Sequence, residues 1–157
     1  MFSSKPRAES EQQILLIVDE TDEQRTDESV LIESGYSADA VKALTGEDAF
    51  HVLFGDGDEK ASRKPSLVII DLDHTREPGR SVLQHLVTEL KDDAAHRVIP
   101  VLLLVRESQH EDVLAWYKTG VNAVAVRPES HDDMVAFFKS VRAFWSENVT
   151  LADDLWP

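Results

Sequence analysis

Acidic side chains directly follow two apolar runs that have the length of buried strands. Asp19 and Glu20 come after the run 14–18, and Asp71 comes after the run 67–70. If the two runs are neighbouring strands of a parallel sheet, their carboxyl ends meet at one edge and bring the three carboxylates together. Carboxylates that converge repel one another unless a cation lies between them. These residues therefore predict a site for a hard divalent ion such as Mg²⁺, which binds carboxylate oxygens and water.

The same residue types could also transfer a phosphoryl group. A carboxylate beside a divalent ion can attack phosphorus and form an acyl phosphate, while the ion and nearby cations neutralise the phosphoryl oxygens. Asp71 stands alone at the end of its apolar run and is the natural nucleophile. Arg127 follows another run of strand length, 123–126, so this cation is expected at the same edge of the sheet.

The elements that must position these residues alternate regularly along the chain. Apolar runs of strand length are each followed by a segment with helical spacing. The predicted strands cover residues 14–18, 40–44, 67–70, 101–105 and 123–126. Their alternation with helices predicts an α/β fold with a doubly wound, five-stranded parallel sheet and five helices, (βα)5.

Side chains that can cap a helix mark most of the helix starts. Thr21, with an amide side chain three residues later, predicts the start of the first helix. This helix is unusually polar and is expected to end near Gly35. Similar patterns begin at Thr45, Ser108 and Ser130 and predict the starts of the second, fourth and fifth helices.

Composition and charge exclude several classes of protein. The chain has 157 residues with 16 basic and 30 acidic side chains, a formal net charge of −14, and no cysteine. This charge repels a phosphate backbone and no basic patch compensates for it, so we expect no nucleic-acid partner. The lack of cysteine excludes disulfides and thiolate metal sites. The apolar runs are far shorter than the roughly 20 residues of a membrane span, so we expect no membrane partner.

We expect one folded domain over residues 13–149. Residues 1–12 are polar and predict a disordered N-terminal tail, and residues 150–157 predict a C-terminal tail. The N-terminal segment lacks the apolar centre of a secretion signal, which indicates a cytoplasmic protein. The spread of acidic residues is typical of a salt-adapted organism or simply of an acidic protein.

Three short motifs, each at the end of a predicted strand, resemble the response-regulator receiver family. They are Val18-Asp19-Glu20, Ile69-Ile70-Asp71 and Val126-Arg127-Pro128. The resemblance covers about residues 13–146 and implies a flavodoxin-like fold. It implies that Asp19 and Glu20 bind Mg²⁺ and that Asp71 accepts a phosphoryl group from a histidine kinase. It also implies that Asp73 contributes its backbone carbonyl to the metal, and Gly79 matches the family's glycine in the loop that follows.

The chain departs from the family pattern at the positions that respond to phosphorylation. Val105 replaces the family's Thr or Ser, whose hydroxyl binds a phosphoryl oxygen, and Arg127 replaces its lysine. Val124 stands where the family has an aromatic residue, and Arg106 stands where the family has a small one. We hypothesise that Arg106 or Arg127 supplies the lost phosphoryl contact through a bidentate hydrogen bond.

Three functions remain open on these residues. The first is a single-domain receiver that is phosphorylated on Asp71 and acts on a downstream target protein by contact, without being an enzyme beyond self-catalysed phosphotransfer and dephosphorylation. The second is a pseudo-receiver that docks to partners independently of phosphorylation. The third is a phosphatase, because Asp71-Leu72-Asp73-His74-Thr75 also resembles the first motif of the haloacid-dehalogenase type. There Asp71 would be the nucleophile and Asp73 the general acid, with Glu107 and Glu129 alone as candidates for the family's later acidic residues.

The last predicted helix carries apolar residues on more than one face. One set recurs at helical spacing and predicts the core face: Phe137, Val141 and Phe144. A second set lies off that face and predicts an exposed apolar surface: Val135, Phe138 and Trp145. Receivers of the resembled family commonly contact partners through their last two helices and fifth strand, which implies a homodimer or a target interface here. Phe144-Trp145 with Val149 and Leu151 further resembles the C-terminal extension of stand-alone receivers related to phytochrome partners.

Overall fold

A computed structural model describes most of the predicted domain. It covers residues 13–55, 64–73, 75–106 and 113–148. Several predictions fall outside these ranges and stay predictions: the tails 1–12 and 150–157, the helix start at Ser108, and His74 and Glu107 of the phosphatase interpretation.

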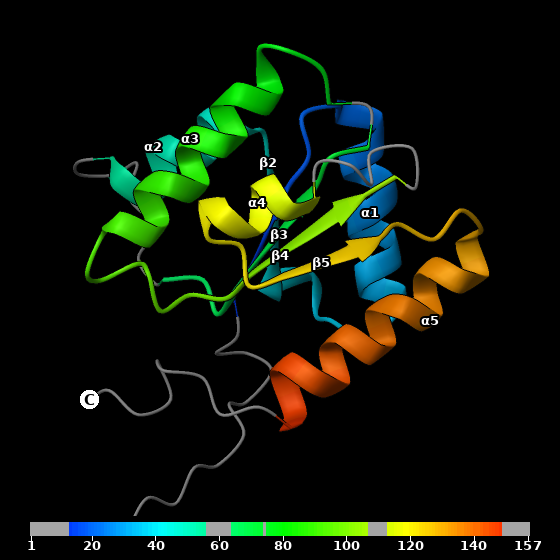
Figure 1. Cartoon of the computed structure of the whole chain (residues 1–157). Coiled ribbons are helices and arrows are strands. Elements are labelled where there is room, and N and C mark those ends of the chain that lie inside the picture. The colour runs from blue at the N-terminus through cyan, green and yellow to red at the C-terminus, as the bar shows by residue number, and fades with distance from the viewer. Residues whose placement is uncertain (1–12, 56–63, 74, 107–112, 149–157) are drawn as a thin grey trace, which may run out of the picture.

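Parallel strands form one sheet at the centre of the described residues (Figure 1). The strands are β1 (Ile14–Ile17), β2 (Val41–Leu44), β3 (Leu67–Asp71), β4 (Val101–Val105) and β5 (Ala123–Val126). Their order across the 5-stranded sheet is β2-β1-β3-β4-β5, so the direction of winding reverses between β1 and β3. The predicted α/β fold of the flavodoxin-like type is confirmed, with strand ends that differ from the predicted ones by about one residue.

Helices cover both faces of the sheet (Figure 1). They are α1 (Thr21–Glu33), α2 (Gly46–Phe54), α3 (Gly79–Asp92), α4 (Val113–Thr119) and α5 (His131–Val141). A 3₁₀-helix at Ala38–Ala40 precedes β2, and α5 continues as a π-helix over Arg142–Asn148. Helices α1 and α5 pack on one face, and α2, α3 and α4 pack on the other. None of the described helices is long and apolar enough to cross a membrane.

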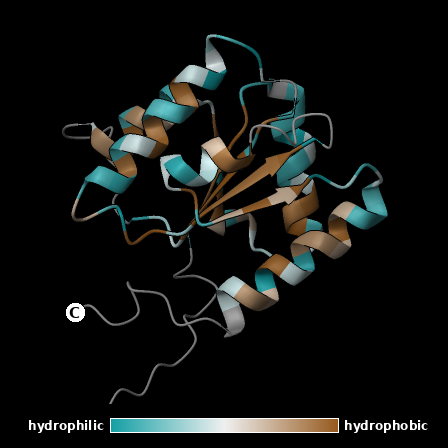
Figure 2. Ribbon diagram, viewed as in Figure 1, coloured by the Kyte–Doolittle hydropathy of each residue, from teal (hydrophilic) through white to brown (hydrophobic). Residues whose placement is uncertain are grey.

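The two faces of the sheet form two hydrophobic layers. Side chains alternate between the faces along a strand, so Ile69 packs towards α1 and α5 while Ile70 packs towards α2 and α3. Among the described residues, the largest fully buried side chain is Phe138 in the layer of α1 and α5 and Trp116 in the layer of α2, α3 and α4. Figure 2 shows the hydrophobic strands between helices whose outer surfaces are largely hydrophilic. The buried acidic side chains Asp71 and Asp73 lie at the carboxyl end of β3, and Asp27 reaches the same site from α1.

The helix starts confirm two of the predicted caps and correct a third. Thr45 and Ser130 each accept a hydrogen bond from the backbone N–H three residues later, as predicted for α2 and α5. The predicted cap at Thr21 is wrong, because Glu20 is the N-cap of α1 and its carboxylate accepts from the backbone N–H groups of Asp22 and Glu23. A carboxylate suits this place because its negative charge complements the positive end of the helix dipole.

The predicted faces of the last helix are also corrected. The core face is formed by Met134, Phe138 and Val141, with Trp145 partly buried against it. Phe144, predicted in the core, is 53% exposed, whereas Phe138, predicted at the surface, is fully buried. Two stripes with helical spacing share Val141, and periodicity alone could not tell which one faces the sheet.

Candidate functional site

Asp71 lies at the carboxyl end of β3, beside β1, where the winding of the sheet reverses. Its side chain is fully buried. One carboxylate oxygen, Oδ1, accepts a hydrogen bond of 2.9 Å from the backbone N–H of Asp73. The other, Oδ2, accepts a hydrogen bond of 2.9 Å from Nε of Arg127. Both oxygens of the predicted nucleophile therefore have a partner in the resting chain.

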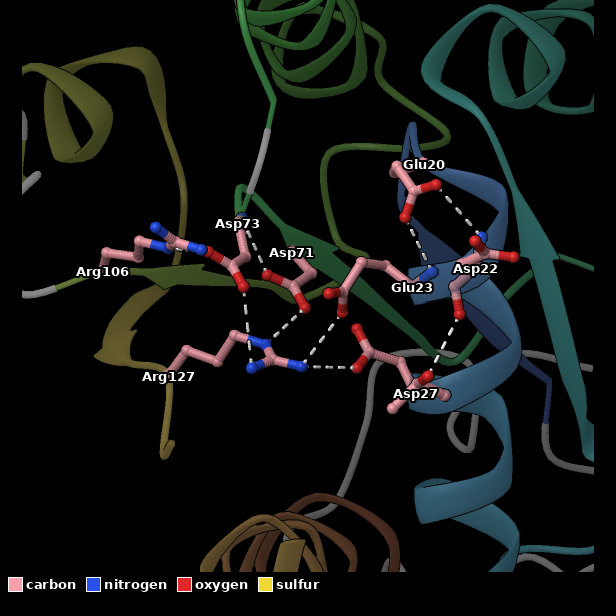
Figure 3. A network of polar contacts seen from close by, with 9 residues as sticks. Glu20, Asp22, Glu23, Asp27, Asp71, Asp73, Arg106 and Arg127 are labelled. Atoms are coloured by element: carbon pink, nitrogen blue, oxygen red, sulfur yellow. Dashed lines mark hydrogen bonds and ion pairs between the residues drawn. The ribbon is translucent and has the colours of Figure 1, made fainter. Parts of the chain in front are cut away.

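Arg127 holds its guanidinium among several carboxylates (Figure 3). Besides Asp71, its Nη2 atom donates to Asp27 Oδ1 at 3.0 Å and to Glu23 Oε2 at 3.2 Å. Its Nη1 atom forms an ion pair of 3.7 Å with Asp73 Oδ2. Burial alone would lower the pKa of Arg127, but the charges of Asp71 and Asp27 outweigh it and raise the pKa. The guanidinium therefore stays charged, and it supplies positive charge where the sequence predicted a cation.

Two of these carboxylates come from α1 and were not among the predicted site residues. Glu23 and Asp27 are four residues apart, so they share one face of the helix, and this face is turned towards Asp71. Oxygen atoms of Glu23, Asp27 and Asp71 all lie within 4.8 Å of one another, and such a group could hold a metal ion. The spacing of the two acids on an unusually polar helix was the available signal.

Asp27 has an unusual environment for a carboxyl group. Burial raises its pKa, and so do a hydrogen bond to Asp71 and the charge of that neighbour, whereas Arg127 lowers it; together they bring the pKa of Asp27 to about 8. Asp27 is fully buried, and its Oδ2 atom has no hydrogen-bond partner among the described residues. Near neutral pH the group can therefore carry a proton that an exposed aspartate would have released.

Asp19 and Glu20 make their described contacts away from Asp71. Asp19 Oδ1 accepts a hydrogen bond of 3.0 Å from the backbone N–H of Gly46, and Glu20 caps α1. A Cβ atom at Gly79 would lie 2.5 Å from Asp19 Oδ2, which explains why this position favours glycine. No described hydrogen bond or ion pair joins Asp19 or Glu20 to Asp71, so their shared metal site stays a prediction.

The positions that depart from the receiver pattern surround the same carboxylates. Val105 is buried and offers no hydrogen-bonding side chain. Arg106 donates through Nε to Asp73, whose side chain also faces Arg127. Both arginines of the phosphoryl-contact hypothesis thus reach the site. Arg127 contacts Asp71, and Arg106 contacts Asp73. The hypothesis stays untested.

An aromatic residue from α4 contacts the strand that lacks the family's aromatic residue. The hydroxyl of Tyr117 accepts a hydrogen bond of 3.0 Å from the backbone N–H of Val124 on β5. Tyr117 was not predicted as a site residue, because helical spacing gave no reason to place its hydroxyl at a strand.

Comparison with known proteins gives the same result for sequence and for fold. No family model matches the chain. The chain is 29% identical over 138 residues to the response regulator Rcp1 of Synechocystis sp., an alignment that covers 88% of this chain and 91% of that protein. The crystal structure of the Mn²⁺-bound form of Rcp1 is similar with a TM-score of 0.69 and 26% identity, over 89% of this chain and 98% of that one.

A second solved structure extends the likeness of the fold. The phosphorylated cyanobacterial phytochrome response regulator RcpA is similar with a TM-score of 0.71, over 90% of this chain and 98% of that one. Its sequence identity of 22% supports the shared fold alone. The matches span nearly the whole of each related protein, and the acidic group at the end of β3 fits a divalent ion. In sequence and in fold, the chain is therefore similar to response-regulator receiver domains.

Proposed function

We propose that the chain is a single-domain response regulator in which Asp71 accepts a phosphoryl group from a histidine kinase. The observation that carries the proposal is the hydrogen bond between the Asp71 carboxylate and the charged guanidinium of Arg127 at the end of β3. In the transfer, a carboxylate oxygen of Asp71 bonds to phosphorus while the bond from phosphorus to the kinase imidazole breaks. The imidazole leaves and takes up a proton, so that atoms and charge balance.

Arg127 and Arg106 would then stabilise the transferred group. A phosphoryl group on Asp71 adds negative charge beside a guanidinium that already contacts the acceptor oxygen. Arg127 can form two parallel hydrogen bonds to such an anion, and this would replace the contact that Val105 cannot make. Arg106 contacts Asp73 and is the second cation within reach.

Mg²⁺ is the proposed cofactor. The carboxylates of Asp19, Glu20 and Asp71 and the backbone carbonyl of Asp73 would hold it, and oxygen donors of this kind suit a hard cation. When bound, the ion neutralises charge on the phosphoryl oxygens. Support comes from the related Rcp1, whose structure was solved with Mn²⁺, and from Asp71, which belongs with Glu23 and Asp27 to an acidic group that could hold a metal ion. Glu20 would have to exchange its capping contacts on α1 for the ion.

The acceptor role is tested by the intact mass of the protein after incubation with acetyl phosphate and Mg²⁺. We expect the wild-type chain to gain the mass of one phosphoryl group. Asp71→Asn should gain none, while the matched control Asp92→Asn, at an exposed acid on α3, should react like the wild type. The absence of an adduct on the wild-type chain would contradict the proposal.

One observation favours the pseudo-receiver as the second candidate. Asp71 is fully buried and Arg127 already fills the space among the carboxylates, as a permanent internal cation would. In that case the chain would dock to its partners with Asp71 unmodified. The same mass measurement separates the two functions, because a docking module gives no adduct under conditions that phosphorylate Asp71.

The contacts of Asp73 argue against the phosphatase. A general acid must be able to reach the leaving group, whereas the Asp73 carboxylate is already paired with Arg106 and Arg127. Relatives with this sequence and fold are signalling receivers. Steady turnover of p-nitrophenyl phosphate that Asp73→Asn abolishes would reverse this conclusion.

The proposed partners are a histidine kinase and a downstream target protein, in the cytoplasm. The surface that we assign to the target or to a second copy is formed by α4, β5 and the end of α5. Four large apolar side chains are exposed on it: Leu114, Tyr117, Val126 and Phe144. Exposed apolar side chains favour burial against a protein surface.

A further inference from the structure

The two halves of α1 are held to the sheet in different ways. The second half packs into the hydrophobic layer through Val30 and Leu31, which are buried. Residues 21–29 contain no aliphatic or aromatic side chain. Most helices depend on the packing of an apolar face for their stability, so this first half must rely on polar contacts instead. One such contact is local, because Gln24 donates to the backbone carbonyl of Val18.

The other polar contacts lead to Arg127 and to the proposed phosphoryl acceptor. Asp27 is fully buried and accepts a hydrogen bond of 3.0 Å from Nη2 of Arg127 (Figure 3). Glu23 accepts one of 3.2 Å from the same nitrogen. Asp27 also forms a hydrogen bond to Asp71. A chemical change at Asp71 must therefore alter the contacts that hold the first half of α1.

The donors of Arg127 cannot serve α1 and a phosphoryl group at the same time. Nε donates to Asp71 at 2.9 Å, and Nη2 donates to Asp27 and Glu23, one carboxylate for each of its N–H groups. A bidentate contact to a phosphoryl group uses two parallel N–H groups. A guanidinium has two such pairs, Nε with Nη2 and Nη1 with Nη2. Each pair includes Nη2, so either contact removes a donor from α1.

The added negative charge acts in the same direction. Carboxylate oxygens of Glu23, Asp27 and Asp71 lie within 4.8 Å of one another. A phosphoryl group on Asp71 brings further negative charge to this place, and a phosphoryl group beside acidic side chains disrupts local contacts by repulsion. The carboxylates of α1 are therefore attracted less and repelled more after phosphorylation.

We propose that α1 is the element that responds to phosphorylation of Asp71. The phosphoryl group takes Nη2 of Arg127 away from the two α1 carboxylates, and the first half of α1 leaves the sheet while the second half stays packed. This route needs neither the hydroxyl nor the ring that Val105 and Val124 lack. The release rests on the proposed function, whereas the anchoring of α1 by Arg127 does not.

Hydrogen exchange of backbone amides tests the release in the wild-type chain. The full chain is labelled with Mg²⁺ alone and with Mg²⁺ and acetyl phosphate, and its intact mass reports the phosphoryl group. We expect the amides of residues 24–29 to exchange at least about tenfold faster after phosphorylation, because local release exposes them to water. The amides of residues 83–90 in α3, on the other face of the sheet, should keep their rates. Unchanged exchange at residues 24–29 in a phosphorylated sample would overturn the proposal.

Arginine variants test the anchoring without phosphorylation. Arg127→Gln removes both Nη2 contacts, so we expect the amides of residues 24–29 to exchange at least about tenfold faster in the unmodified variant. The labelling time is kept so short that α3 stays protected in every chain, which excludes exchange through global unfolding. Arg106→Gln is the matched control, because Nε of Arg106 donates to Asp73, and it should leave these rates unchanged. Equal exchange in the two variants would show that Arg127 does not hold α1.

The failure of the release can be told apart from the failure of the proposed function. If Asp71 gains a phosphoryl group while residues 24–29 keep their exchange rates, the release is wrong and the acceptor role stands. If no adduct forms but Arg127→Gln still releases α1, the acceptor role is wrong and the anchoring by Arg127 stands.

Discussion

At the scale of the residue, the guanidinium of Arg127 is the positive charge that contacts the buried carboxyl groups of Asp71 and Asp27. The sequence could predict that Asp71 and Arg127 come together, because both follow strands whose carboxyl ends share one edge of a parallel sheet. It could not predict Glu23 and Asp27. Which face of α1 turns inward depends on how the helix sits on the sheet, and a helix with so few apolar residues carries little information about its rotation.

The role of Arg127 in stability can be measured directly. Arg127→Gln leaves the buried carboxylate of Asp71 without its counter-charge and Asp27 without its hydrogen-bond donor, so we expect the free energy of unfolding to fall by about 3 kcal/mol. Urea denaturation of both chains measures this difference. Arg106→Gln is the matched control, because its side chain is 47% exposed and its loss should change the free energy by less than about 1 kcal/mol. Similar losses in the two variants would contradict the central position of Arg127.

The raised pKa of Asp27 predicts how stability depends on pH. With a folded pKa of about 8 against an ordinary value of 3.8, the folded chain keeps a proton that the unfolded chain has released. This contribution to stability is fully present below the unfolded pKa and is lost as the pH rises through the folded value. The free energy of unfolding should therefore fall between about pH 4 and pH 8 because of this group.

Asp27→Asn removes that titration and keeps the shape of the side chain. Relative to the wild type, we expect the variant to gain about 1 kcal/mol or more in stability between pH 5 and pH 9. Denaturation across this range measures the difference, with Asp22→Asn as a control at an exposed acid on the same helix. Parallel pH profiles for the wild type and Asp27→Asn would contradict the raised pKa.

At the scale of the element, apolar runs and capping residues determined most of the fold. Buried strands stand out in the sequence because every residue of a central parallel strand is apolar, as in β1 and β4. The caps at Thr45 and Ser130 were predictable because a Ser or Thr hydroxyl just before a helix accepts a hydrogen bond from a backbone N–H of the first turn, which has no partner within the helix. Glu20 was not predicted as a cap because the receiver resemblance assigned it to Mg²⁺ binding at the end of β1. Its carboxylate caps α1, where its negative charge complements the positive end of the helix dipole.

The exposed apolar surface of α4, β5 and the end of α5 predicts self-association. Leu114 is 64% exposed on α4, and Tyr117 on α4 and Val126 on β5 are also exposed. We expect sedimentation equilibrium to show a dimer of the wild-type chain and a monomer of Leu114→Glu, because the new charge would be buried in the interface. Val98→Glu, at an exposed apolar residue after α3, is the matched control and should leave the dimer intact. A strictly monomeric wild-type chain would contradict the homodimer.

At the scale of the whole molecule, the architecture brings every charged group of the site to one edge of the sheet. The strand order places β3 between β1 and β4. Helix α1 packs on one face of the sheet, and its side chains Glu23 and Asp27 point towards Asp71 at the end of β3. The order of elements along the chain made this architecture predictable, since strict alternation of strands and helices requires parallel pairing. The internal counter-cation was not predictable at this scale, because it depends on side-chain contacts between elements far apart in sequence.

The most direct test of the acceptor role compares NMR spectra of the chain alone, with Mg²⁺, and with Mg²⁺ and beryllofluoride, which mimics a phosphoryl group on aspartate. We predict that resonances of Asp71, Arg127 and the ends of β3 and β5 shift when both are present, and that Asp71→Asn shows no such shift. A wild-type spectrum that beryllofluoride leaves unchanged in the presence of Mg²⁺ would contradict phosphoryl acceptance by Asp71.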